Sequence, residues 1–283
     1  MTVIWNQTKT AILLGLMFGL IVALGAVLGG PRGVILAALF GGLGAIISFY
    51  FSDKIAISAM RGQLATPQTA PDLITMVERL ANNAGLPMPK VYICPQQAPN
   101  AFATGRNPKN AAVAVTEGAL QLLDYNELEG VIAHELAHIK NRDTLISTIA
   151  AIIAGTLNAA QWLLIFGGSR DNVNPIVMIA MIIGAPFAAA LIQMAISRSR
   201  EFIADADAAR IAGSPDGLIG ALQKLDAYAK RIPLQGSSST QNHMFIVQPL
   251  SGEGLAGLFS THPATKKRIE SLRNLEPSWY SAT

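Results

Sequence analysis

Long apolar runs alternate with shorter amphipathic and polar stretches along the chain. Four runs contain no charged residue, at residues 11–30, 34–51, 145–168 and 175–196. Each is long enough to cross about 30 Å of hydrocarbon as a helix, so we expect four transmembrane helices. Polar residues within the third run leave a re-entrant or bundle-buried helix as an alternative for that run. The first run is too long for a cleaved secretory signal, and the second follows almost at once, which favours an uncleaved anchor.

The segment between the second and third runs has the periodicities of a small folded domain. Residues 72–83 carry apolar side chains at helical spacing, and Gly85 follows as a typical helix stop. Short runs with β-branched residues predict strands at residues 91–94, 101–104 and 111–116. The turn-rich stretch between the last two strands predicts a hairpin. A short helix over residues 117–123 is expected to lead from this small sheet into the next helix.

The composition places much of the chain in lipid. The sequence is 51% hydrophobic and 14% charged, whereas roughly 25% of the residues of a soluble domain are charged. The single cysteine, Cys94, excludes an internal disulfide, fits a reducing compartment and is expected to be buried in a strand. The net charge of +3 comes without a dense basic cluster with interleaved aromatic residues, so we expect no nucleic acid partner.

The positions of Lys and Arg set the orientation of the predicted spans. Most basic residues near the runs lie before the first, between the second and third, or after the fourth, whereas Arg32 and Arg170 lie on the other side. Because cytoplasmic loops carry the excess of Lys and Arg, we expect a multi-pass membrane protein with both termini in the cytoplasm. The predicted organisation is an N-terminal transmembrane hairpin, a first domain part, a second apolar hairpin and a second domain part, at residues 1–52, 53–144, 145–197 and 198–283.

The segment at residues 131–143 carries the candidate chemistry. His134 and His138 are four apart, so on a helix both imidazoles lie on one face and can bind one metal ion, and Glu135 can reach a metal-bound water. Neutral imidazole suits zinc, and a catalytic zinc needs a third protein ligand. Helical spacing begins at Asn126, and because no proline interrupts the residues that follow, we expect one unbroken helix that continues into the third apolar run.

A candidate third ligand follows the fourth apolar run. Residues 188–211 contain neither glycine nor proline, so we expect one helix there, with Glu201 and Asp205 on the same face. Glu201 is the predicted third zinc ligand, and Asp205 is the predicted carboxylate that holds a ligand imidazole in its tautomer. Arg198 and Arg200 leave a second interpretation open, in which this is only a charged face at the membrane interface.

Four motifs occur together in the chain. They are HELAH followed by Asp143, SREFIAD at residues 199–205, THPATKKRI at residues 261–269 and NAFATG at residues 100–105. As a set they resemble the motifs of the HtpX-type membrane zinc metalloproteases, gluzincins related to the CAAX prenyl proteases. Ala264 departs from the family pattern, in which a second proline is expected. The resemblance implies an α-helical integral membrane protein with an α+β zincin (gluzincin) protease domain that contains a small β-sheet.

The resemblance also implies a role for individual residues. Glu135 would take a proton from the attacking water and deliver it to the leaving amine, and His262 or Arg268 would stabilise the transition state. The implied ligands of one Zn²⁺ per subunit are His134, His138 and Glu201. The implied substrate-binding edge strand consists of Asn100, Ala101, Phe102, Ala103 and Thr104.

By this resemblance the chain is an endopeptidase of the cell inner membrane that degrades misfolded or damaged membrane proteins on the cytoplasmic side. Its implied partners are polypeptide substrates and the lipid bilayer, with a homo-oligomer or an association with other membrane quality-control proteases left open. One alternative is a catalytically silent zinc-binding membrane scaffold or adaptor, which would need no base at Glu135. The other is a CAAX-type processing protease, which would need an enclosed lipid-lined chamber built from more spans than this chain offers. We expect the site at the cytoplasmic membrane surface, since both ligand segments adjoin apolar runs.

Overall fold

The computed structural model describes residues 15, 18–26, 30–144, 200–231 and 265–279. The chain separates into two compact units. The first comprises Met1–Ser52 and Leu145–Ile196, and the second comprises Asp53–Thr144 and Ser197–Thr283. The predicted spans at residues 145–168 and 175–196, and about half of the first predicted span, lie outside the described residues.

A long apolar helix makes up most of the described part of the first unit. Its π-helical turn η1 spans Ala37–Gly41, and α2 spans Gly42–Tyr50. The helix Gly30–Tyr50 is the one helix among the described residues with the length and hydropathy to cross a membrane. The helix predicted at the second apolar run is therefore confirmed, although it begins earlier than predicted, because Pro31 sits in the first turn, where its missing N–H breaks no helical hydrogen bond. Large apolar side chains exposed along it are Ile35, Leu36, Leu39, Phe40, Leu43, Ile46, Ile47 and Tyr50.

Small residues bring helical segments of the first unit into close contact. A Cβ atom added to Gly25 would lie 2.5 Å from the Cβ of Ala37, and one added to Gly41 would lie 2.6 Å from Cγ2 of Ile21. Such distances leave no room for a side chain. The helices at residues 18–26 and 30–50 therefore pack through glycines, as small residues allow in membrane helix pairs.

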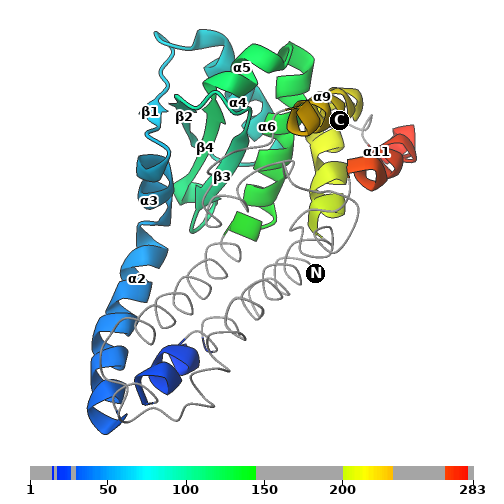
Figure 1. Cartoon of the computed structure of the whole chain (residues 1–283). Coiled ribbons are helices and arrows are strands. Elements are labelled where there is room, and N and C mark those ends of the chain that lie inside the picture. The colour runs from blue at the N-terminus through cyan, green and yellow to red at the C-terminus, as the bar shows by residue number, and fades with distance from the viewer. Residues whose placement is uncertain (1–14, 16–17, 27–29, 145–199, 232–264, 280–283) are drawn as a thin grey trace. The chain divides into compact units, whose positions relative to one another are not determined.

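The second unit contains a four-stranded mixed sheet with the order β1-β2-β4-β3 (Figure 1). The hairpin of β3 and β4 is antiparallel, as predicted, whereas β2 and β4 run parallel and the short β1 pairs antiparallel with β2. The strands are β1 (Gln63–Leu64), β2 (Lys90–Cys94), β3 (Ala101–Gly105) and β4 (Ala111–Thr116). The three strands predicted from the sequence are confirmed, and β3 lies at one edge of the sheet.

The helices described beyond the apolar helix confirm most of the predicted pattern. The predicted helix after residue 71 ends at Gly85, which adopts the left-handed conformation with φ of 68°. The α-helices described after the apolar helix are α3 (Ser52–Ala59), α4 (Pro71–Ala84), α5 (Glu117–Leu122), α6 (Tyr125–Lys140), α9 (Asp216–Arg231) and α11 (Thr265–Arg273). Two 3₁₀ turns are η2 (Pro108–Asn110) and η4 (Pro277–Trp279). Residues 200–212 are also helical.

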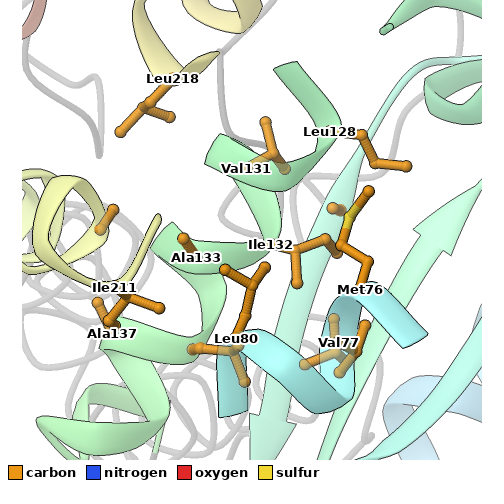
Figure 2. Packing of buried hydrophobic residues seen from close by; sticks show 14 of the residues in the cluster. Met76, Val77, Leu80, Leu128, Val131, Ile132, Ala133, Ala137, Ile211 and Leu218 are labelled. Carbon is orange, nitrogen blue, oxygen red and sulfur yellow. The ribbon is translucent and has the colours of Figure 1, made fainter. Parts of the chain in front are cut away.

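Apolar side chains cover both faces of the sheet. On one face Val113 and Val115 of β4 join the main core formed with α4, α6 and α9. On the other face Ala114 packs with Ile57 and with Cys94, which is buried as predicted. The core residues labelled in Figure 2 are Met76, Val77, Leu80, Leu128, Val131, Ile132, Ala133, Ala137, Ile211 and Leu218.

Helix α6 is fixed by its start and by a close crossing with α9. At its N-terminus Asp124 and Glu127 form a capping box, and Nζ of Lys224 on α9 lies 2.5 Å from the Glu127 carboxylate. A Cβ atom on Gly130 would collide with the backbone nitrogen of Leu218. The backbones of the two helices are therefore in contact at this crossing, which fixes the position of α6 against α9.

The predicted unbroken helix from Asn126 into the third apolar run is wrong. Helix α6 ends at Lys140, and Arg142 adopts a positive φ of 59°, a conformation that non-glycine residues seldom adopt. The side-chain amide of Asn141 donates to Oδ2 of Asp207 at 2.8 Å. Helical spacing in the sequence did not anticipate the break, because it is stabilised by contacts with residues far along the chain.

Candidate metal centre

Three side chains that could bind a metal converge on one buried point. Nε2 of His134 lies 3.1 Å from Nε2 of His138, both on α6. The carboxylate of Glu201 lies 3.6 Å from each of these nitrogens. One ligand atom from each residue lies within 4.8 Å of the others. The structure therefore brings together the three residues that the sequence nominated as zinc ligands.

A carboxylate holds the outward nitrogen of each histidine. Nδ1 of His134 lies 3.0 Å from Oδ1 of Asp205, and Nδ1 of His138 lies 3.1 Å from Oδ2 of Asp143. A carboxylate accepts only, so each Nδ1 carries the proton and donates it. In the neutral ring each Nε2 then presents its lone pair toward the other. Nη2 of the Arg268 guanidinium lies 3.3 Å from Nε2 of His134, so a positively charged side chain stands beside this part of the cluster.

Asp143 also connects the two segments that carry the ligands. Its Oδ1 accepts a hydrogen bond from Nη1 of Arg200 at 3.2 Å, and Arg200 directly precedes Glu201. Both side chains are buried. The break after α6 therefore has a structural consequence, because the turn at Arg142 places Asp143 between His138 and the helical segment at residues 200–212.

Arg268 of α11 is buried beside the ligands. Its Nε and Nη2 donate to the two carboxylate oxygens of Asp205 at 2.8 and 2.6 Å, and its Nη1 lies 3.2 Å from Oε2 of Glu201. Burial opposes the charge of Arg268, but the carboxylates of Asp205 and Glu201 outweigh it and raise the pKa of the guanidinium. Arg268 therefore contacts two carboxylates, and its Nη2 also lies 3.3 Å from Nε2 of His134. Its role in stabilising the transition state stays a prediction.

The electrostatics of the cluster favour positive charge. Burial and the nearby Arg268 oppose a proton on His134, yet hydrogen bonds to Asp205 and Glu201 outweigh them and raise the pKa of His134 to about 9. Burial likewise opposes a charged His138, but its bond to Asp143 contributes to a raised pKa. The same carboxylates that attract a proton would attract a divalent cation.

Glu135 lies beside the cluster and contacts the sheet. Its Oε2 accepts a hydrogen bond from the backbone N–H of Ala103 on β3 at 2.7 Å. Burial raises the pKa of the Glu135 carboxyl, and this backbone bond acts in the opposite direction. The candidate base is therefore held between its own helix and the edge strand.

In the predicted substrate strand, the backbone groups of some residues face β4 and those of others face the candidate base. The backbone N–H of Asn100 donates to Oγ1 of Thr116 at 2.8 Å, and the N–H of Thr116 donates to the carbonyl of Asn100 at 2.9 Å. Asn100 therefore faces the neighbouring strand, while Ala103 faces Glu135. Phe102 is buried against the far face of the sheet, and Thr104 is also buried. His262 lies outside the described residues.

The donor set fits a small, borderline-soft divalent metal. Two imidazole nitrogens and one carboxylate oxygen are the ligands typical of catalytic zinc sites, whereas calcium and magnesium favour oxygen alone. The carboxylates on the outward nitrogens of both histidines are the supports that such ligands usually have. The residues present therefore match the metal that the sequence implies.

The fold, the cluster of three candidate ligands and the candidate base together indicate the class of protein. A buried helix with His134, Glu135 and His138, joined by Glu201 from a separate helix, is the arrangement of a metallopeptidase. Residues 67–276 match the family model described as Peptidase family M48, and the chain belongs to this family. It is a metalloprotease.

Similar curated proteins carry the name "Protease HtpX homolog". The one from Desulforapulum autotrophicum is 50% identical over 95% of this chain and 90% of its own length. The one from Desulfatibacillum aliphaticivorans is 51% identical over 96% and 90%, and the one from Pyrococcus furiosus is 48% identical over 94% and 95%. Among solved structures, that of S. mikatae Ste24p matches with a TM-score of 0.46 and 20% identity, over 85% of this chain and 64% of that one.

Sequence reasoning missed two features of the site. Asp143 entered only as part of a motif, and its spacing of five from His138 is not a helical contact distance, so no pattern linked the two. The contact of Ala103 with Glu135 uses the main chain, which has no signature in the sequence. Both features depend on how separate segments meet.

Proposed function

We propose that the chain is a membrane-embedded zinc endopeptidase that cleaves misfolded or damaged membrane proteins on the cytoplasmic side. The observation that carries the proposal is the convergence of His134, His138 and Glu201 next to Glu135. The apolar helix Gly30–Tyr50 supports the membrane location. The Lys and Arg distribution supports a cytoplasmic protease domain.

His134, His138 and Glu201 would hold the zinc ion. When bound, the ion supplies a Lewis acid that polarises the scissile carbonyl and acidifies water. Asp205 and Asp143 keep the two imidazoles turned toward the ion by accepting their Nδ1 protons. This orientation directs both Nε2 atoms toward the ion.

Glu135 would act as the proton carrier of the reaction. Its carboxylate takes a proton from the attacking water and delivers it to the nitrogen of the leaving amine. The Ala103 N–H occupies one lone pair of Oε2, so the remaining carboxylate lone pairs stay available for this transfer. Stabilisation of the transition state stays a prediction for His262.

The peptide substrate would bind in extended form along β3. This strand lies at the edge of the sheet, where main-chain pairing gives affinity without strong sequence preference. Loose selection suits the removal of damaged proteins, which share no sequence. Polypeptides and the lipid bilayer are therefore the proposed partners, and a homo-oligomer is compatible with the proposal.

The Glu135→Gln variant tests the proposal. It keeps the three ligands and removes the proton acceptor, so we expect unchanged zinc content and a loss of cleavage of at least about 100-fold. Zinc is measured in the purified variant, and cleavage is measured with casein and with a co-expressed model membrane substrate. Equal activity of the variant and the wild type would remove Glu135 from the mechanism. A wild-type protein that binds zinc and cleaves neither substrate would support a zinc-binding scaffold instead.

A further inference from the structure

The main chain of β3 contacts the candidate base directly. The bond from the N–H of Ala103 to Oε2 of Glu135 is 2.7 Å long, and Glu135 is only 6% exposed. It joins the edge strand to a side chain of α6 rather than to another strand. Bonds from N–H groups to buried carboxylates are among the stronger hydrogen bonds in proteins.

The hydrogen bonding of β3 shows which of its groups face outward. Asn100 exchanges hydrogen bonds with Thr116 at the end of β4. Successive residues of an antiparallel strand direct their backbone groups to opposite sides. Ala101, Ala103 and Gly105 therefore direct their N–H and C=O groups to the outer edge of the sheet.

These three outward positions are not equivalent. Ala101 is buried, and the carbonyl of Gly105 accepts a hydrogen bond from Oγ1 of Thr144 at 3.1 Å. Ala103 is the one residue of β3 with intermediate exposure. Its N–H is used by Glu135, and its C=O points to the same edge. Ala103, the most accessible residue of β3, is therefore also the residue whose main chain contacts the candidate base Glu135.

We propose that the main chain of Ala103 positions the reaction in two ways. Its N–H fixes the carboxylate of Glu135, and its C=O accepts a hydrogen bond from a backbone N–H of the bound polypeptide. This inference rests on the proposed function, in which Glu135 is the base and β3 binds the substrate. Because both groups belong to one residue, the distance between the base and the paired peptide unit is set by the strand itself.

This arrangement restricts the register of the substrate. A peptide paired with the Ala103 carbonyl cannot slide along β3 without losing that hydrogen bond, because alternate backbone groups face away. The bond to be cleaved then lies at a fixed offset from Glu135. Side chains of the substrate need not supply this alignment, so any extended stretch of polypeptide can be aligned with Glu135 without a preferred sequence.

The Ala103→Pro variant removes the N–H and keeps the C=O. Proline is tolerated at an edge strand where the N–H faces away from the sheet. We expect kcat to fall roughly 10- to 100-fold, since a misplaced catalytic group costs that much, while KM changes by less than about twofold because the carbonyl that binds peptide remains. Both constants are measured on the zinc-loaded full chain with a quenched casein-derived peptide.

Leu64→Pro is the matched control. Leu64 lies on β1 at the opposite edge of the sheet and is 55% exposed. Its neighbour Ala65 donates its N–H to Val91, so Leu64 directs its own N–H away from the sheet. This variant loses an equivalent group far from Glu135 and should keep the wild-type kcat. A fall in kcat equal to that of Ala103→Pro would show only a general effect of proline on the sheet.

Amide hydrogen exchange in the wild-type fold gives a second measurement that needs no proline. An outward N–H on an edge strand exchanges readily unless it is bonded, so the Ala103 amide should be protected in the wild type. Its protection should fall about tenfold or more in Glu135→Ala and stay unchanged in Glu117→Ala, a change at an exposed acid on α5. Unchanged protection in Glu135→Ala would overturn the inference. If Ala103→Pro does not bind zinc and its kinetics cannot be measured, this exchange measurement decides the question alone.

The two proposals can fail separately. If Glu135→Gln cleaves normally, the proposed base is wrong. If Glu135→Gln is inactive while Ala103→Pro keeps the wild-type kcat, the base is right and only the positioning role of Ala103 is refuted.

Discussion

Replacing Arg268 with methionine should destabilise the second unit. The guanidinium is 1% exposed and is the bidentate partner of Asp205 as well as a neighbour of Glu201. Methionine fills similar space but carries no charge, so two buried carboxylates lose their counter-charge. Breaking a buried ion pair in this way costs about 3–5 kcal/mol.

This free energy corresponds to a measurable shift in melting temperature. For a domain of this size each kcal/mol shifts Tm by about 2–4 °C, so we expect a fall of roughly 6–20 °C. Thermal unfolding of the purified, detergent-solubilised protein measures it, with zinc present and with zinc removed by a chelator. Lys267→Met is the control, because it removes a neighbouring charge on the exposed side of α11.

A second variant, Asp205→Asn, separates the contribution of the ion pair to stability from that of side-chain packing. In Asp205→Asn the negative partner is already gone, so adding Arg268→Met should cost less than it does in the wild type. A coupling energy of at least about 1.5 kcal/mol is expected for groups in direct contact. If Arg268→Met melts with the wild type, or if the two changes are additive, the reasoning from the buried ion pair is wrong.

Three further outcomes follow from the same geometry. Glu201→Ala should lower zinc content as severely as His134→Ala, measured by metal analysis, since each removes one of three ligands; zinc retained by the first variant alone would exclude Glu201 as a ligand. Asp143→Asn should weaken zinc binding by about 10- to 100-fold in a chelator competition, because His138 loses the carboxylate that holds its ring; an unchanged affinity would mean that the contact is incidental. Thr116→Val should lower Tm more than Thr116→Ser, because its buried hydroxyl accepts from two backbone N–H groups that valine leaves unpaired; equal Tm values would contradict this.

Elements specified by local pattern could be predicted from the sequence. The spacing of His134 and His138 needs only a helix to become a ligand pair, and α4 follows from its apolar positions with Gly85 as a stop. Glu201 could be nominated because carboxylate ligands on a second helix are usual for this kind of site. For α4 and for the histidine pair, the residues that decide the outcome lie within a few helical turns of each other, whereas Glu201 was nominated from the chemistry that the site requires.

The remaining features depend on residues far apart in the chain. Strand β1 has only two residues, too few for an alternating pattern, and it exists because β2 offers a partner. The parallel pairing of β2 with β4 depends on the path of the chain between them. The end of α6 reflects the contact of Asn141 with Asp207, which no local pattern records. The sequence therefore nominated the three side chains that converge and the Asp205 contact, but not the contacts of Asp143 and Ala103.

The order in which the chain supplies these groups has a consequence for biosynthesis. The histidines come first, the carboxylates of Glu201 and Asp205 follow after a long interval, and Arg268 comes later still. A growing chain emerges from its N-terminus onward. Until α11 has been made and docked, the buried acids beside the ligands lack their counter-charge. The last charged group of the centre is therefore supplied late in synthesis, after all three candidate ligands.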